Sequence, residues 1–131
     1  MADYDHEKYA DEARTRWGDT EAYRQSQSRT KSYSDADWAE IKAEMDSIEA
    51  DFAAAMNGGA TPDSEAGMAL AERARLHIDQ RYYTCSHSMH AALADMYTAD
   101  ERFRAHYDDR AEGLAQFVSD AIKANAARQS G

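Results

Sequence analysis

Apolar residues recur at helical spacing through most of the chain after residue 34. In the strongest run the apolar positions keep to one side of a helix, and they are Trp38, Ile41, Met45, Ile48, Phe52 and Met56. Ser34 and Asp37 form a capping box at the start of this run, and Asn57-Gly58 is a typical helix stop. The pattern therefore predicts a helix over 35–56.

Three later segments show the same periodicity. Their apolar positions are Met68, Ala71, Ala74, Ile78 and Tyr82 in 64–83; Met89, Leu93, Met96 and Tyr97 in 86–97; and Leu114, Phe117, Val118, Ala121 and Ile122 in 112–127. Asp100 can cap a further short helix that holds Phe103 and Tyr107. No stretch alternates as a strand does, and 131 residues are enough for one core. We therefore expect a single all-α domain, built as a helical bundle.

The first third of the chain differs in composition from the rest. Between Ala2 and Asp37 there is no Val, Ile, Leu, Met or Phe, and the large apolar groups are Tyr4, Tyr9, Trp17, Tyr23 and Tyr33. Helices are expected over 4–17 and 20–31, the second capped by Asp19 or Thr20. Burial of a few aromatic rings does not offset about 1 kcal/mol or more of backbone entropy per ordered residue.

The weak apolar content predicts a division of roles within the single domain. Residues 1–33 form N-terminal lid helices that are poorly stabilised without ligand, and residues 34–131 form the helical core. The alternative is that the N-terminal helices pack statically through their aromatic rings.

Composition narrows the classes of partner. The formal net charge is −10 and no dense basic stripe occurs, so we expect no nucleic-acid binding by this chain. No apolar run approaches a membrane span, and the acidic N-terminus is unlike a signal peptide. The single cysteine cannot form an intramolecular disulfide, which favours a reducing compartment. We therefore expect a cytoplasmic protein that does not associate with membranes.

The residues with most chemical potential lie in the segment 82–90, around Cys85. If a helix starts at Ser86, its free N–H groups and dipole favour the thiolate of Cys85, and a protonated His87 acts in the same direction. A thiol with a lowered pKa can add to an electrophile. The alternative is a buried cysteine that serves as a small apolar residue.

Metal and cofactor readings of the same segment are weaker. Cys85, His87 and His90 offer three ligand side chains, but Cys85 does not share the helical face of the two histidines. His77 is a candidate haem ligand, although a single histidine is more often a hydrogen-bonded wall residue. A Cys-dependent hydrolase would need one of these histidines aligned with Cys85. We expect no metal and no cofactor.

The sequence resembles the TipAS antibiotic-recognition domain, the drug-binding part of thiostrepton-induced regulators of the MerR type. The resemblance runs from about Tyr9 to Gln129. It is carried by Arg16-Trp17-Gly18-Asp19-Thr20 with Tyr23, Asp37-Trp38 with Ile41, Cys85-Ser86, Met89-His90, Leu93, Met96-Tyr97, Asp100, Arg102-Phe103, His106-Tyr107-Asp108, Gly113-Leu114-Ala115, Ala121-Ile122 and Ala124-Asn125-Ala126. Thr84 and Ala74 depart from the usual family pattern, in which an acidic residue is common at the first position and a histidine is frequent at the second, while His77 remains.

The resemblance implies a globin-like fold that binds large, hydrophobic, peptide-derived antibiotics, with N-terminal helices that settle around the drug. In thiostrepton-binding members a cysteine matching Cys85 adds to a dehydroalanine of the thiopeptide. The expected ligand-binding residues are Cys85 as the covalent attachment point, His77, Tyr82, Tyr83, Met96, Trp17, Tyr23, Trp38, Phe103 and Tyr107.

The expected function is antibiotic binding and sequestration, by a binding domain and not an enzyme. The chain lacks the DNA-binding domain and coiled coil of full-length regulators, so we expect a monomer, either a stand-alone drug-sequestering form or the effector domain of a MerR-type regulator that senses a drug or confers resistance. The alternatives are a haem-binding globin-like protein and a Cys-dependent enzyme.

Overall fold

The computed structural model describes residues 20–130. They form α2 (Glu21–Thr30), α3 (Asp35–Asn57), α4 (Glu65–Arg81), α5 (His87–Ala99), α6 (Glu101–Asp108) and α7 (Leu114–Ser130), and residues 20–130 contain no strand. The predicted all-helical fold is confirmed. The helix predicted over 4–17, with Trp17, lies outside the described residues.

Local capping explains why the helices begin where they do. The capping box of Ser34 and Asp37 is present at the start of α3. Ser64 and Ser86 accept hydrogen bonds from the third backbone N–H of α4 and α5, and Asp100 caps α6. The last helix begins at 114, two residues later than predicted, because Gly113 has a φ of +84° that no helical residue adopts.

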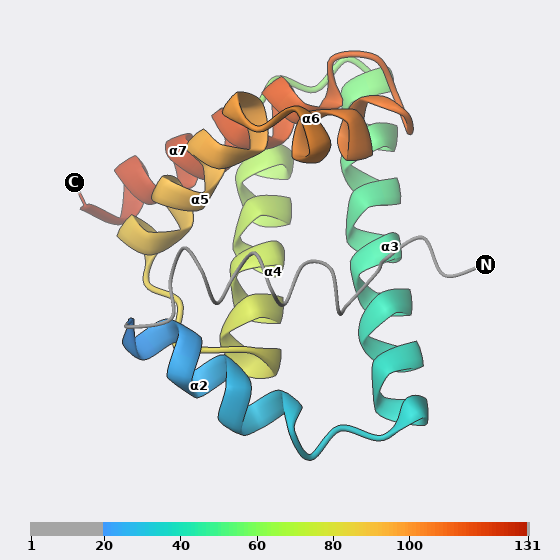
Figure 1. The fold of residues 1–131 in the computed structure, drawn as a ribbon. Helices are drawn as coiled ribbons and strands as arrows, with labels where there is room; N and C mark the ends of the chain where they lie inside the picture. The colour runs from blue at the N-terminus through green and yellow to red at the C-terminus, as the bar shows by residue number, and fades with distance from the viewer. Residues whose placement is uncertain (1–19, 131) are drawn as a thin grey trace.

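The helices form two groups that cross each other (Figure 1). α3 and α4 run side by side and antiparallel, while α5 and α7 pair with each other and lie across one end of α4. The turn between α3 and α4 requires Gly67, because a Cβ atom there would lie 2.5 Å from the carbonyl oxygen of Pro62. α7 also contacts α3, α4 and α6, so it is the central helix of the bundle.

The core lies where α7 meets the other helices. Its largest fully buried apolar side chains are Phe52, Leu114, Val118 and Ile122, and the rings of Phe52 and Phe117 meet edge to face at 6.3 Å. At about 25 cal/mol per Å² of apolar surface, each such side chain contributes about 1.5–3 kcal/mol.

α2 is attached to this core through polar groups. It has no buried residue. Arg29 donates a hydrogen bond to the carbonyl oxygen of Asp79, and the Tyr33 hydroxyl, just beyond α2, donates to that of Arg81. The Gln25 side chain accepts a hydrogen bond of 2.8 Å from the backbone N–H of Thr84. α2 therefore docks on the C-terminal end of α4, and its weak stabilisation without ligand stays a prediction.

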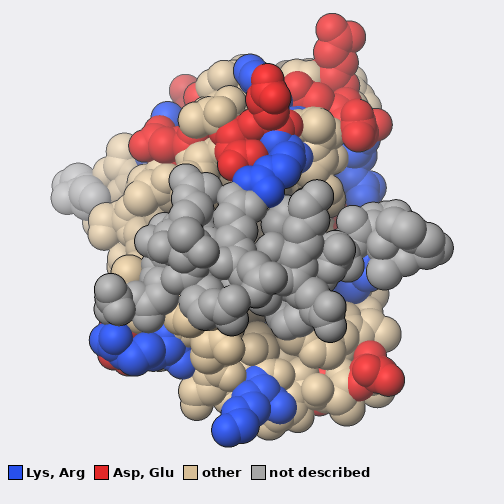
Figure 2. All heavy atoms as spheres, viewed as in Figure 1, with Lys and Arg blue, Asp and Glu red and all other residues tan. Residues whose placement is uncertain are grey.

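Charges are distributed unevenly over the surface. On the face shown in Figure 2, acidic side chains gather at the end of the molecule where α6 lies, while Lys and Arg are scattered. Among the described residues of this face there is no basic stripe of the kind that follows a phosphate backbone. None of the helices in 20–130 combines the length and apolar content that crossing a bilayer demands.

Candidate functional site

The Cys85 loop, residues 82–86, connects α4 to α5. Ser86 is the N-cap of α5 and its Oγ accepts a hydrogen bond of 3.1 Å from the N–H of Met89, so Cys85 directly precedes the cap. The thiol is buried, with Cys85 1% exposed, and Sγ lies 3.7 Å from the carbonyl oxygen of Ser86. The helix start predicted next to Cys85 is confirmed.

Two side chains of α4 hold the backbone of Cys85. Its N–H donates a hydrogen bond of 2.9 Å to Oδ1 of Asp79, and its carbonyl oxygen accepts one of 2.7 Å from the guanidinium of Arg75. Hydrogen bonds to charged groups are stronger than those between neutral groups. The loop is therefore fixed on both sides of the residue that carries the thiol.

Glu72 is the centre of the polar network that holds Arg75 in place. Its carboxylate accepts hydrogen bonds from Arg75, from Nε2 of His87 at 2.8 Å and from the side-chain amide of Asn125 at 3.0 Å. The bond with Arg75, together with those from Asn125 and His87, lowers the pKa of Glu72 to about 2. α4, α5 and α7 thus converge on one carboxylate behind the Cys85 loop.

The prediction of a lowered thiol pKa is wrong for this conformation. Burial raises the pKa of Cys85 to about 11, although the nearby Arg75 acts in the opposite direction. His87, expected to favour the thiolate, contacts Glu72. Sequence position identified the helix start, but the helix dipole does not outweigh the removal of the thiol from water.

A second feature is the aromatic cluster of Tyr33, Trp38 and Tyr82, at the N-terminal end of α3 and the C-terminal end of α4. Tyr33 and Trp38 meet edge to face at 5.5 Å, and Trp38 lies 6.3 Å from Tyr82. All three rings are half-buried. They form an apolar surface with polar edges, of the kind that suits a large organic ligand.

His77 contacts the aromatic cluster through Tyr82. Its ring is 6.3 Å from that of Tyr82, it is 7% exposed, and Nε2 is 3.2 Å from Oε1 of Glu44 without hydrogen-bond geometry. Burial lowers the pKa of His77 in spite of the neighbouring Glu44. Glu44 in turn is held by Arg81, which lowers the pKa of this carboxyl. The cluster thus has a buried imidazole against Tyr82, and the ion pair of Arg81 and Glu44 lies next to that imidazole.

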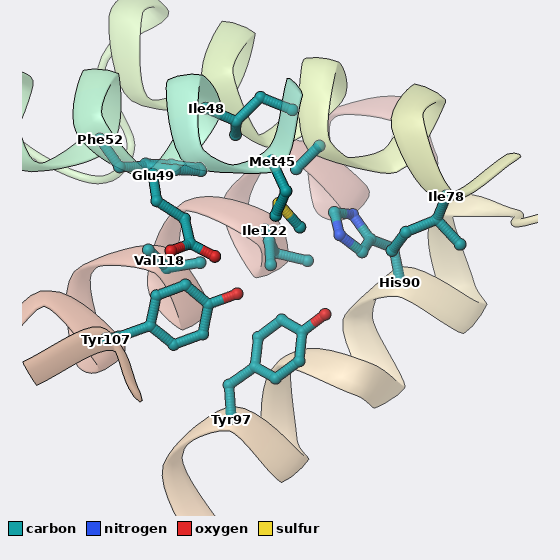
Figure 3. Close-up of a pocket in the computed structure, with 11 residues that line it drawn as sticks. Met45, Ile48, Glu49, Phe52, Ile78, His90, Tyr97, Tyr107, Val118 and Ile122 are labelled. Carbon is teal, nitrogen blue, oxygen red and sulfur yellow. The ribbon is translucent and has the colours of Figure 1, made fainter. Parts of the chain in front are cut away.

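A third feature is an interior pocket between α3, α4, α5, α6 and α7 (Figure 3). Its apolar lining is Met45, Ile48, Phe52, Ala74, Ile78, Val118 and Ile122. Four polar side chains also face it: Glu49, His90, Tyr97 and Tyr107. Its free volume is about 10 Å³, so the pocket has room for about one water molecule.

The remaining predicted ligand residues are dispersed. Tyr83 is half-buried in the Cys85 loop, where burial raises its pKa. Met96 and Tyr23 are half-buried on α5 and α2. Phe103 packs on Tyr97 at 5.6 Å, and Tyr107 is 5% exposed in the core. The structure brings Trp38, Tyr82 and His77 together and places Tyr107 in the lining of the interior pocket. Which of the predicted residues touch a ligand stays a prediction.

Two buried polar residues, Glu49 and Asn125, are not among the site residues predicted from the sequence. Glu49 is 4% exposed and contacts Nε2 of His106 at 2.9 Å. Asn125, 1% exposed, joins the Glu72 network. Both fall on the apolar stripes of their helices, Glu49 between Met45 and Phe52, and a polar residue on such a stripe is the signal that could have found them.

The positions of the histidines and acidic residues, and the size of the interior pocket, can be compared with what a metal ion or a haem requires. Among residues 20–130, no three side chains of His, Cys, Asp or Glu gather as metal ligands do. The interior pocket that His90 faces has room for about one water molecule, far less than a haem needs. The described geometry therefore offers a thiol, an aromatic surface and a small pocket, which suit binding of an organic ligand.

A family model described as the TipAS antibiotic-recognition domain matches residues 9–125. The chain is 44% identical over 130 residues to the HTH-type transcriptional activator TipA of Streptomyces coelicolor, across 99% of this chain and 51% of that protein. It is 40% identical over 114 residues to the HTH-type transcriptional activator mta of Bacillus subtilis, across 87% of this chain and 43% of that protein. The chain spans about half the length of the curated relatives it matches.

Solved structures give the same result for the fold. TipAS of Streptomyces lividans, in complex with the thiopeptide nosiheptide, superposes with a TM-score of 0.91 and 43% identity, over 98% of this chain and 90% of that chain. The antibiotic-binding domain of a TipA-class multidrug resistance transcriptional regulator gives 0.64 and 41%, over 70% of this chain and 97% of that chain. The globin-like helical fold that the resemblance implies is confirmed.

Proposed function

The chain belongs to the TipAS antibiotic-recognition family, and from that premise we propose that it binds large, hydrophobic, peptide-derived antibiotics of the thiopeptide class. The observation that carries this proposal is the match to a TipAS protein in complex with nosiheptide, with the same fold over 98% of this chain. Proteins with this identity and the same fold place corresponding side chains at equivalent positions. We therefore propose the same class of ligand for this chain, and not the same individual ligand.

The aromatic cluster and the Cys85 loop are the surfaces proposed to receive the antibiotic. Tyr33, Trp38 and Tyr82 supply half-buried rings that a flat heterocycle can contact without the loss of much side-chain entropy. The other residues proposed to bind the antibiotic are Cys85, His77, Tyr83, Met96, Tyr23, Phe103 and Tyr107. Trp17 is also proposed, and it lies outside the described residues.

We further propose covalent capture through Cys85. The thiolate adds to the β-carbon of a dehydroalanine, an Sγ–C bond forms as the carbon–carbon double bond becomes a single bond, and the α-carbon takes up a proton from water. The thiol proton passes to water, and nothing is oxidised or reduced. Because the thiol is 1% exposed, this step requires the Cys85 loop to open first.

The proposed biological role is to sense or sequester the drug, either as the effector domain of a MerR-type regulator or as a stand-alone binding form. The named relatives are transcriptional regulators of about twice the matched length. For this domain by itself we propose a monomer. The role is stoichiometric binding, not turnover.

Calorimetry of the full chain with nosiheptide tests the binding proposal. We expect saturation near one ligand per chain, and weaker binding in Trp38→Ala. Asp95→Ala is the control, since Asp95 pairs with Lys123 on the exposed side of α5 and α7. If titration with nosiheptide releases no heat of binding and other thiopeptides show no binding either, the proposed ligand class is wrong.

Intact mass spectrometry tests the covalent step separately. Incubation with a thiopeptide that carries dehydroalanine is expected to add the mass of one ligand to the wild type and none to Cys85→Ser. If calorimetry detects binding but the mass of the protein does not increase, the antibiotic is bound noncovalently and the covalent step is wrong. Catalytic consumption of ligand, with many molecules lost per chain, would instead favour the enzyme alternative.

A further inference from the structure

His90 is the most deeply buried histidine in the described part of the chain, at 2% exposed. It lies on α5, three residues after His87, and its imidazole is directed into the interior pocket (Figure 3). Among residues 20–130, no side chain or backbone group forms a hydrogen bond with Nε2 of His90. Buried polar atoms without a partner are rare in folded proteins, because each loses its hydration without compensation.

The pocket has the size and the polar lining to hold a water molecule that could be the missing hydrogen-bond partner of Nε2. Its free space of about 10 Å³ is close to the smallest volume, about 10–15 Å³, that holds one water molecule. The hydroxyl groups of Tyr97 and Tyr107 and the carboxylate of Glu49 face the same space as His90 (Figure 3). A buried water needs two to four polar partners, and the lining offers that number.

We propose that this pocket is a binding site for one small hydrogen-bond donor, an ordered water molecule, held by Nε2 of His90 and the hydroxyl groups of the pocket. The water donates to Nε2, which fixes the neutral ring in the tautomer with its proton on Nδ1. Because the pocket cannot admit a larger group unless its walls move, the water site is separate from the aromatic cluster and the Cys85 loop, and it shares Tyr107 with the residues proposed for the antibiotic.

The contrast with His77 supports this assignment. Nitrogen atoms of His77 also lack hydrogen-bond partners, but a carboxylate oxygen of Glu44 lies 3.2 Å from its Nε2, so a small rotation can satisfy it. His106 contacts Glu49 directly. For Nε2 of His90, no carboxylate contact of this kind is found among residues 20–130, and His90 is the histidine that faces the pocket.

Oxygen-17 magnetic relaxation dispersion on the full chain tests the proposal, because it counts long-lived internal waters and is insensitive to hydroxyl protons. We expect the wild type to contain such a water and His90→Leu to lose one. His87→Gln changes a histidine of the same helix outside the pocket, and is expected to retain the wild-type amplitude.

Ala74→Val keeps His90 and fills the pocket, so it decides the question even if His90→Leu does not fold. Ala74 lines the pocket and is 6% exposed. We expect this variant also to lose one long-lived water. A wild type without a long-lived water, an amplitude unchanged in Ala74→Val, or a loss in His87→Gln equal to that in His90→Leu would overturn the assignment.

Discussion

The backbone N–H of Cys85 donates a hydrogen bond of 2.9 Å to the carboxylate of Asp79, six residues earlier on α4. Together with the bond from Arg75 to the carbonyl oxygen of Cys85, this contact holds the loop in the conformation that buries the thiol. Access to the thiol therefore depends on residues that do not touch it.

Asp79→Ala is expected to increase the rate at which a disulfide reagent modifies Cys85. Loss of a hydrogen bond to a charged group costs about 1.5 kcal/mol or more, which corresponds to about a tenfold larger population of the open loop. Thiol release measured by absorbance gives the rate. Asp79→Asn keeps an acceptor oxygen without the charge and should react at a rate between those of the wild type and Asp79→Ala. Equal rates in all three proteins would show that the bond does not restrain the loop.

The raised pKa of Cys85 gives a second prediction. At pH 8 a thiol with a pKa of about 11 contains about a hundredfold less thiolate than one with the ordinary value of 9.0. Alkylation of the ligand-free protein should therefore be slow and should keep rising with pH beyond 9. The urea-unfolded chain is the reference, and a plateau at the same pH in both states would contradict the raised pKa.

Acid should destabilise the protein through His90. Burial lowers the pKa of His90 from 6.5 to about 4, so between these values the unfolded chain binds a proton that the folded chain does not. The free energy of unfolding should fall as pH decreases through this window, by up to about 3 kcal/mol from this group. Urea denaturation of wild type and His90→Gln measures the difference, and parallel curves for the two proteins would count against it.

His106 should behave in the opposite way. The hydrogen bond with the buried carboxylate of Glu49 raises the pKa of His106 above 6.5. The stabilisation from this pair is complete below the ordinary pKa and is lost as pH rises through the folded value. In an NMR titration the midpoint of His106 should decrease in Glu49→Gln, whereas Asp109→Asn, which changes a more weakly interacting carboxylate, should move it less.

Local signals in the sequence predict the helices well. The capping box at Ser34 and the caps at Ser86 and Asp100 depend on residues three or fewer positions apart, and the structure forms all of them. The predicted start of the last helix at residue 112 is wrong, because Gly113 has a positive φ and therefore lies outside the helix.

Long-range packing explains what the sequence did not predict. The pKa of Cys85 depends on burial and on contacts from Arg75 and Asp79, which a helix start alone does not indicate. The Glu72 network joins three helices, and no local pattern pairs Glu72 with Asn125, 53 residues later. Likewise, no local pattern pairs Trp38 with Tyr82, although the two rings lie 6.3 Å apart.

The polar attachment of α2 makes this helix an exchangeable module for protein engineering. None of its side chains is buried, so its sequence is free to change without repacking of the core, provided that the groups equivalent to Arg29 and Gln25 keep their partners. A library of α2 variants on one constant bundle would therefore vary the surface beside the Cys85 loop while the thermal stability of the scaffold stays the same.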